Sequence, residues 1–215
     1  MDTLNIKSGL ILLVVFLFIQ IIVRIMFRTI GFSLKDANLP EDWLRFIRDS
    51  TAILIFIIYL FYSNNLDSTD FTISYSWMFF FIILVLSLLI IENLFLSKFT
   101  SSESELFDIL KQYPISQIVN ILLFAPIIEE IVCRKIILGD MNLGSIWIAL
   151  FVSTFIFAIL HFQFNFFDFI LIFFYGLLLG FCYIKTESII NPIILHIFFN
   201  AIQLLFIFNN EKSIE

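Results

Sequence analysis

The chain has 215 residues, 61% of them hydrophobic, and a mean hydropathy of +1.05. Because soluble domains are about 45–50% apolar, this composition excludes an ordinary soluble protein and indicates an integral membrane protein. The formal net charge is −6, and no nucleic-acid partner is expected. The two cysteines lie in apolar runs and form neither a disulfide framework nor a CxxC metal motif.

Seven apolar runs are candidates for membrane helices, which need about 20 apolar residues each. They cover residues 9–27, 52–62, 77–95, 115–138, 146–162, 167–184 and 189–208. The second run is short, so we expect that helix to begin earlier with an amphipathic half. The first run lacks a small-residue cleavage pattern, and we interpret it as a retained span rather than a signal peptide. The expected fold is an all-α, polytopic membrane protein of about seven spans.

Local signals mark the ends of several of these helices. Pro40-Glu41-Asp42 is typical of a helix start, with proline in the first turn and acids near the positive end. Gly144-Ser145 predicts the turn into the fifth run. Gly176 and Gly180, four residues apart, predict a face for close helix packing. Asp168 is expected to lie in a loop.

The chain is divided here into three parts. Residues 1–110 would hold three N-terminal spans and an acidic link, residues 111–208 a catalytic core of four spans, and residues 209–215 a polar tail. Five basic residues flank the first loop, whereas the next polar segment, 63–76, has none. This asymmetry places the first loop in the cytoplasm and the N-terminus outside. The abundance of Phe, Ile and Asn favours a bacterial source, so we expect a multi-pass protein of a bacterial plasma membrane.

The fourth run carries two acids and an arginine that a membrane helix would not expose to lipid. Each charge at the bilayer centre costs about 2.5–3.5 kcal/mol, so Glu129, Glu130 and Arg134 must face a protein interior or a wet cavity. Glu130 and Arg134 are four residues apart and predict an ion pair. Glu129 lies about 100° away around the helix and is left for another role, which suits a general base. A purely structural ion pair is the alternative.

Both histidines of the chain lie in later apolar runs, and each shares a helix face with a residue four positions away. The pairs are Phe157 with His161 and His196 with Asn200. If the fourth and fifth helices fold back at 144–145, Glu129 and His161 reach similar depth. The same count with straight helices puts His196 about two turns from His161, a gap that a tilt or kink must close.

Three short motifs therefore lie on three runs, in the order Glu129-Glu130-xxx-Arg134, Phe157-xxx-His161 and His196-xxx-Asn200. They resemble the motifs of the CAAX protease and bacteriocin-processing (Abi) family of intramembrane proteases. The resemblance covers about residues 115–205, and Cys133 and Lys135 depart from the residues that family members often carry beside the arginine. It implies a membrane endopeptidase that cleaves near the C-terminus of a peptide or membrane-associated protein.

The resemblance also implies roles for individual residues. The implied catalytic residues are Glu129, Glu130, Arg134, His161, His196 and Asn200. Glu129 and His161 would activate the attacking water, His196 and Asn200 would stabilise the oxyanion, and the remaining pair would hold the site in shape. Zinc, held by His161, His196 and Glu129, would suit this donor set, and a metal-free mechanism is equally open.

Substrate and rival functions stay open at this stage. A CAAX-type protein or a bacteriocin- or pheromone-like peptide would suit the implied activity. One rival is a non-enzymatic membrane immunity or regulatory partner that keeps the protease fold. Another is an ion-coupled carrier, which inverted repeats would favour and which the sequence does not show.

Overall fold

The computed structural model describes residues 6–34, 41–92, 114–141, 143–161 and 166–212. Within these ranges the chain is all helical and contains no strand. In chain order the elements are α1 (Ile6–Leu34), α2 (Glu41–Tyr62), a short 3₁₀ helix η2 (Ser68–Phe71), α3 (Tyr75–Ile91), α5 (Pro114–Val119), η4 (Asn120–Phe124), α6 (Ala125–Glu130), η5 (Ile131–Asp140), α7 (Ile146–Leu160), α8 (Phe166–Thr186) and α9 (Ile190–Lys212). The four elements from α5 to η5 follow one another without a break, and η4 and η5 are π-helical.

The predicted apolar runs coincide with these helices, with differences at the ends. The helix start predicted at Pro40-Glu41-Asp42 is confirmed, because α2 begins at Glu41. The last helix continues to Lys212, into the segment expected as a polar tail. Residues 93–113, which include the end of the third expected run and the acidic link, lie outside the described residues. The prediction that Asp168 lies in a loop was wrong, since Asp168 is buried in the first turn of α8.

Two of the described helices are long and apolar enough to cross a membrane, Lys7–Arg28 within α1 and Phe166–Thr186. The apolar helices α3, α7 and residues 190–206 of α9 are shorter. Seven spans therefore stay a prediction. The outer face of α1 carries large apolar side chains, of which Val14 is 63% and Phe18 61% exposed. Contiguous exposed apolar surface of this kind suits contact with lipid rather than water.

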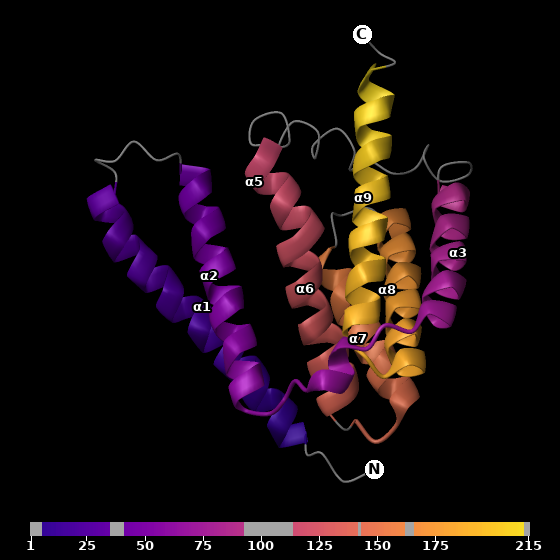
Figure 1. Ribbon diagram of the computed structural model, residues 1–215, viewed down its shortest axis with the longest axis horizontal. Coiled ribbons are helices and arrows are strands. Elements are labelled where there is room, and N and C mark those ends of the chain that lie inside the picture. Colours follow the sequence, from indigo (N-terminus) through magenta and orange to yellow (C-terminus); the bar gives the residue numbers. More distant parts are fainter. Residues whose placement is uncertain (1–5, 35–40, 93–113, 142, 162–165, 213–215) are drawn as a thin grey trace.

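The helices are arranged as a bundle with a separate pair beside it (Figure 1). The α5–η5 helix, α7, α8 and α9 form the bundle, and α3 packs against α8 and α9 on one side. On the opposite side α1 and α2 pack against each other, and the lower part of α1 contacts η5. Figure 1 shows that α1 and the α5–η5 helix run in opposite directions.

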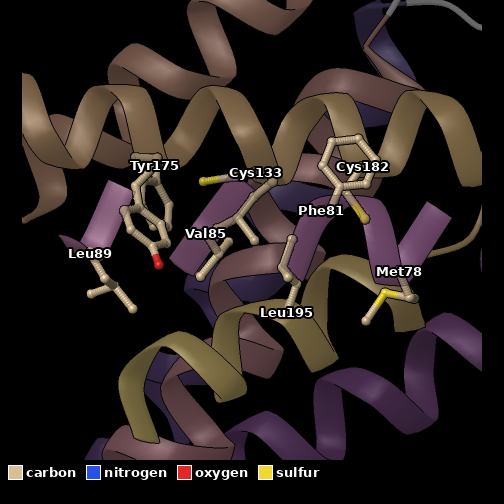
Figure 2. Close-up of a cluster of buried hydrophobic side chains, with 10 residues drawn as sticks. Met78, Phe81, Val85, Leu89, Cys133, Tyr175, Cys182 and Leu195 are labelled. Atoms are coloured by element: carbon tan, nitrogen blue, oxygen red, sulfur yellow. The ribbon is translucent and has the colours of Figure 1, made fainter. Parts of the chain in front are cut away.

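One hydrophobic cluster joins α3 to the bundle (Figure 2). Met78, Phe81, Val85 and Leu89 recur every three or four residues along α3, which places them on one helix face. They pack against buried side chains of η5, α8 and α9, namely Cys133, Tyr175, Cys182 and Leu195. Both cysteines are free and buried, so the expectation that they are packing residues is confirmed.

The predicted packing face on α8 is confirmed, and it lies against α7. A methyl group on Gly176 would lie 3.1 Å from Phe157 Cδ1 and 3.2 Å from Thr154 Cγ2, and one on Gly180 would overlap Leu150 Cδ1. The two glycines therefore allow α8 to approach α7 closely. This contact fixes the last turns of α7, which carry Phe157 and His161.

The segment between α2 and α3 is tied to the bundle by polar contacts. Lys135 Nζ lies 3.0 and 2.9 Å from the two carboxylate oxygens of Asp70, and Ser188 donates to the Asp70 carbonyl at 2.7 Å. Asn191 accepts from the Ser74 amide at 3.0 Å and donates to the Thr72 carbonyl at 2.8 Å. Lys135, a departure from the family pattern, thus anchors this segment.

Candidate active site

The helix that carries the two glutamates is irregular just before them. Ala125 donates its main-chain N–H to Asn120, five residues back, which is the π-helical pattern. In the same pattern the next N–H would bond to the carbonyl of Ile121. Residue 126 is proline, which has no N–H, so the Ile121 carbonyl is left without a main-chain donor.

Asn200 of α9 supplies the missing donor. Its side-chain Nδ2 donates to the Ile121 carbonyl at 2.8 Å. A partly buried carbonyl without a hydrogen bond would be costly, so this contact stabilises the junction between η4 and α6 and ties α9 to it. Asn200 was predicted to stabilise an oxyanion; one of its two N–H groups is used here, and the other is available for that role.

The predicted pair of Glu130 and Arg134 is present and is fully buried. Arg134 Nε donates to Glu130 Oε2 at 2.9 Å, and neither side chain is exposed. Arg134 Nη1 donates to Ser153 Oγ at 2.9 Å, and that hydroxyl donates to the Cys133 carbonyl at 2.6 Å. The guanidinium carbon also lies 5.0 Å from the centre of the Phe157 ring, a cation–π contact. Buried charges require such partners.

Glu130 has a second partner, His196 of α9. His196 Nδ1 lies 3.0 Å from Glu130 Oε1, and the histidine is 4% exposed. Glu130 therefore connects Arg134 to His196 with one carboxylate oxygen on each. Since the carboxylate can only accept, the proton between them belongs to His196 Nδ1.

His161 is held in the same way at the end of α7. The main-chain N–H of His161 bonds to Ile159, so the Phe157 carbonyl lacks its regular helical donor. His161 Nδ1 lies 2.8 Å from that carbonyl. A carbonyl can only accept, and the proton is therefore on Nδ1 of this ring as well.

Both rings turn their remaining nitrogen toward Glu129. His161 Nε2 lies 3.4 Å and His196 Nε2 3.7 Å from the same oxygen, Glu129 Oε2. In the neutral rings these nitrogens carry lone pairs, and the carboxylate is an acceptor too. Both distances exceed those of a good hydrogen bond, about 2.7–3.2 Å. Three acceptors thus converge on one point, an arrangement that binds a donor such as water.

The straight-helix estimate for His196 was wrong. It placed His196 about two turns from His161, whereas both rings contact Glu129. The estimate assumed regular α-helices with parallel axes, and two of the segments involved are π-helical. The similar depth expected for Glu129 and His161 is confirmed by their 3.4 Å contact.

A family model of Rce1-like type II CAAX prenyl endopeptidases matches residues 111–202. This segment of the chain belongs to the CAAX protease family. It contains all six predicted site residues, from Glu129 to Asn200. Comparison with curated proteins and with solved structures gave no match.

A cavity of about 440 Å³ leads to this CAAX protease site from one side. It lies between α1, α2 and the α5–η5 helix, and Glu129 is part of its wall. Neither histidine lines it. Glu129 is 23% exposed at its side chain and His161 32%, whereas His196 is 5% exposed. The cavity therefore gives access to the carboxylate on which the two rings converge.

The donor atoms at Glu129 are of the types that zinc accepts: two imidazole nitrogens and a carboxylate oxygen. Each ring also has its Nδ1 proton fixed by an acceptor, as metal-bound histidines have. However, among the residues that the structure describes, no group of three His, Cys, Asp or Glu side chains is placed to hold a metal ion. Zinc stays a prediction, and the mechanism below has no step through a metal.

Several residues of the site were not predicted from the sequence. Ser153 bonds to Arg134, and the Ile121 carbonyl bonds to Asn200. Serine and main-chain carbonyls are too common in membrane helices to attract attention in a sequence. Pro126 was a usable signal, because a proline inside a helix leaves one carbonyl in need of a donor.

Proposed function

We propose that this protein is an intramembrane endopeptidase that hydrolyses a peptide bond with water activated by Glu129. The observation that carries the proposal is the convergence of His161 Nε2 and His196 Nε2 on Glu129 Oε2 at 3.4 and 3.7 Å. Membership of the CAAX protease family supports the same activity. The substrate would be a peptide or membrane-associated protein, either of CAAX type or resembling a bacteriocin or pheromone.

In the proposed reaction Glu129 acts as the general base. A water donates to Glu129 and His161, and its oxygen attacks the carbonyl carbon of the scissile bond while one proton passes to Glu129. Glu129 then returns that proton to the amide nitrogen as the C–N bond breaks. The products are one peptide with a new carboxylate and one with a new amine.

The remaining residues would orient the base and stabilise the developing charge. Glu130, held by Arg134, can balance a positive charge on the His196 ring, so that His196 Nε2–H donates to the oxyanion. The second N–H of Asn200 is a further donor for the same oxygen. In zinc-dependent catalysis a metal at Glu129, His161 and His196 would supply the Lewis acid and the activated water.

The proposal places the protein in a bacterial plasma membrane with its N-terminus outside. The loop between α1 and α2 would then be cytoplasmic. Basic residues around this loop support that orientation. A cysteine introduced at Asn64, in the next turn, would be labelled from the outside by an impermeant reagent.

The test is cleavage of membrane-anchored fluorogenic peptides by purified protein. We expect wild type to cleave and His161→Gln to lose most activity, while Glu187→Gln, an exposed acid at the other end of the bundle, keeps it. A strong chelator added to wild type separates the two mechanisms: loss with recovery on adding zinc indicates the metal, and no loss indicates the metal-free route. Equal activity of His161→Gln and wild type would contradict the proposed site.

A further inference from the structure

The cavity beside Glu129 carries one positive charge, Arg24 of α1. No other lining residue is basic. The nearby acid Asp49 is already paired, because both of its oxygens bond to Arg48 at 2.8 and 3.0 Å. Among the described residues no hydrogen bond or ion pair occupies Arg24. A charged side chain in an apolar helix that lines a cavity marks a functional site.

The rest of the cavity wall on α1 is apolar with one amide. Phe16, Leu17, Gln20, Ile21 and Arg24 form a single stripe of the helix, at spacings of one, three and four residues. Arg24 stands at one end of the stripe, about 12 Å along the axis from Phe16. The cavity therefore presents an apolar surface that ends at a cation.

The opposite wall shows which end of the cavity holds the reacting groups. The α5–η5 helix runs antiparallel to α1 (Figure 1), so Asn120 lies toward the same end as Arg24, and Glu129 lies toward the other. Nine residues of helix separate Asn120 from Glu129, which is about 13 Å. An extended peptide spans that distance with about four residues.

We propose that Arg24 binds the C-terminal carboxylate of the substrate, so that the last few apolar residues lie along the α1 stripe and the scissile bond lies at Glu129. Guanidinium and carboxylate form two parallel hydrogen bonds, which makes arginine the residue suited to this group. Gln20 and Asn120 are placed to bond the peptide main chain. This inference rests on the proposed endopeptidase activity and adds to it the group that the enzyme selects.

The same cation could hold the headgroup of an anionic lipid, or extend to the membrane surface without a ligand. These alternatives differ from the proposal in one measurable respect. Only binding of the substrate carboxylate makes the effect of Arg24 depend on the chemical form of the peptide terminus.

The first test compares two lipid-anchored peptides of the same apolar sequence, one ending in a carboxylate and one in a carboxamide. We expect wild type to prefer the acid in kcat/KM by roughly tenfold to a hundredfold, the range for a hydrogen bond to a charged group. Arg24→Gln should abolish the preference, and Arg24→Lys should keep part of it. The matched control is Arg28→Gln, an exposed arginine one turn further along α1 and outside the cavity lining, which should keep the full preference.

Binding tests the proposal without turnover. In the Glu129→Gln background we would measure the rise in Tm caused by the acid and amide peptides, in neutral lipid and in lipid with phosphatidylglycerol. The proposal predicts that only the acid raises Tm, that Arg24→Gln removes the rise, and that lipid charge does not matter. If acid and amide give equal shifts, or if Arg24→Gln keeps the preference for the acid, the proposal is wrong.

A lipid-binding role gives a distinct result. The effect of Arg24→Gln would then be the same for both peptides and would vanish in neutral lipid, which overturns the proposal. Failure of the endopeptidase function itself would show differently, as a Glu129→Gln enzyme with undiminished cleavage. Preference for the acid in the binding experiment would support the carboxylate site even in that case.

Discussion

The side-chain amide of Asn200 donates to the Ile121 carbonyl at 2.8 Å, and Pro126 is the reason that this carbonyl needs a donor. The contact joins α9, which carries His196, to the helix that carries Glu129. A residue implied to act on the oxyanion thus also has a defined structural contact. The two roles can be separated by changing the proline.

We expect Asn200→Ala to lower the Tm, because it leaves a carbonyl unsatisfied at a cost of about 1–2 kcal/mol. Pro126→Ala restores a main-chain N–H for Ile121. In the Pro126→Ala background, Asn200→Ala should therefore cost clearly less. The measurement is a double-mutant cycle on thermal unfolding in detergent.

Asn65→Ala, whose amide bonds only within its own turn, serves as the control and should be additive with Pro126→Ala. An equal cost of Asn200→Ala in both backgrounds would show that the proline does not create the need for Asn200. Activity adds a second readout. If Asn200 also contributes to the oxyanion, cleavage stays low in the double variant although stability recovers.

Ser153 should matter for stability because it completes the hydrogen bonding of a buried charge. Ser153→Ala removes the acceptor of Arg134 Nη1 and the donor to the Cys133 carbonyl, both fully buried. We expect a loss of about 1–3 kcal/mol. Ser87→Ala is the matched control, since this exposed hydroxyl bonds only to its own helix, and its effect should stay within about 0.5 kcal/mol. Similar Tm values for the two variants would contradict the account of Arg134.

Asp140 predicts a pH dependence of stability. It follows the apolar run that ends at residue 138, and burial raises the pKa of its carboxyl to about 6 from an ordinary value of 3.8, against the opposing effect of Lys135. Its Oδ2 is buried without a hydrogen bond among the described residues. The folded protein thus holds the proton more tightly than the unfolded chain.

The contribution of Asp140 to stability is therefore fully present below about pH 4 and is lost as the pH rises through 6. For a partly buried group we expect about 1–2 kcal/mol, below the 1.4 kcal/mol per pKa unit of a fully buried one. Asp140→Asn should flatten this part of the pH profile of Tm. An unchanged profile in the variant would show that another group titrates in this range.

Gly180 tests the close contact of α7 and α8. A methyl group at this position overlaps Leu150 Cδ1, so Gly180→Ala should destabilise the protein by about 1–3 kcal/mol. Leu150→Val removes the overlapping carbon and should restore part of the loss in the double variant. The result against this account would be a Gly180→Ala protein as stable as wild type.

The helices were predictable from the sequence because apolar runs and their breaks carry the signal. Glu41, Ser145 and the two glycines of α8 lie where the sequence predicts. The loop predicted at Asp168 was wrong because a single acid near Phe-rich sequence does not show where a helix begins. In the structure Asp168 belongs to the first turn, where acids favour the positive helix end.

The site was predictable to the extent that buried charges must have partners. That rule led to the pairing of Glu130 with Arg134 and to the separate role of Glu129. It did not show that His196 contacts both acids, because counting residues along straight helices ignores π-helical segments. The role of Arg24 in the cavity wall was also missed, since its charge had been used only as a sign of membrane orientation.

The most direct test of the central claim is the activity of Glu129→Gln. This change keeps the size of the side chain and removes the base on which His161 and His196 converge. With Tm close to that of wild type, and with Glu187→Gln as the control, we predict a fall in kcat of about 10²- to 10⁴-fold on a membrane-anchored peptide. Cleavage by Glu129→Gln within a few-fold of wild type would contradict the assignment of Glu129 as the general base.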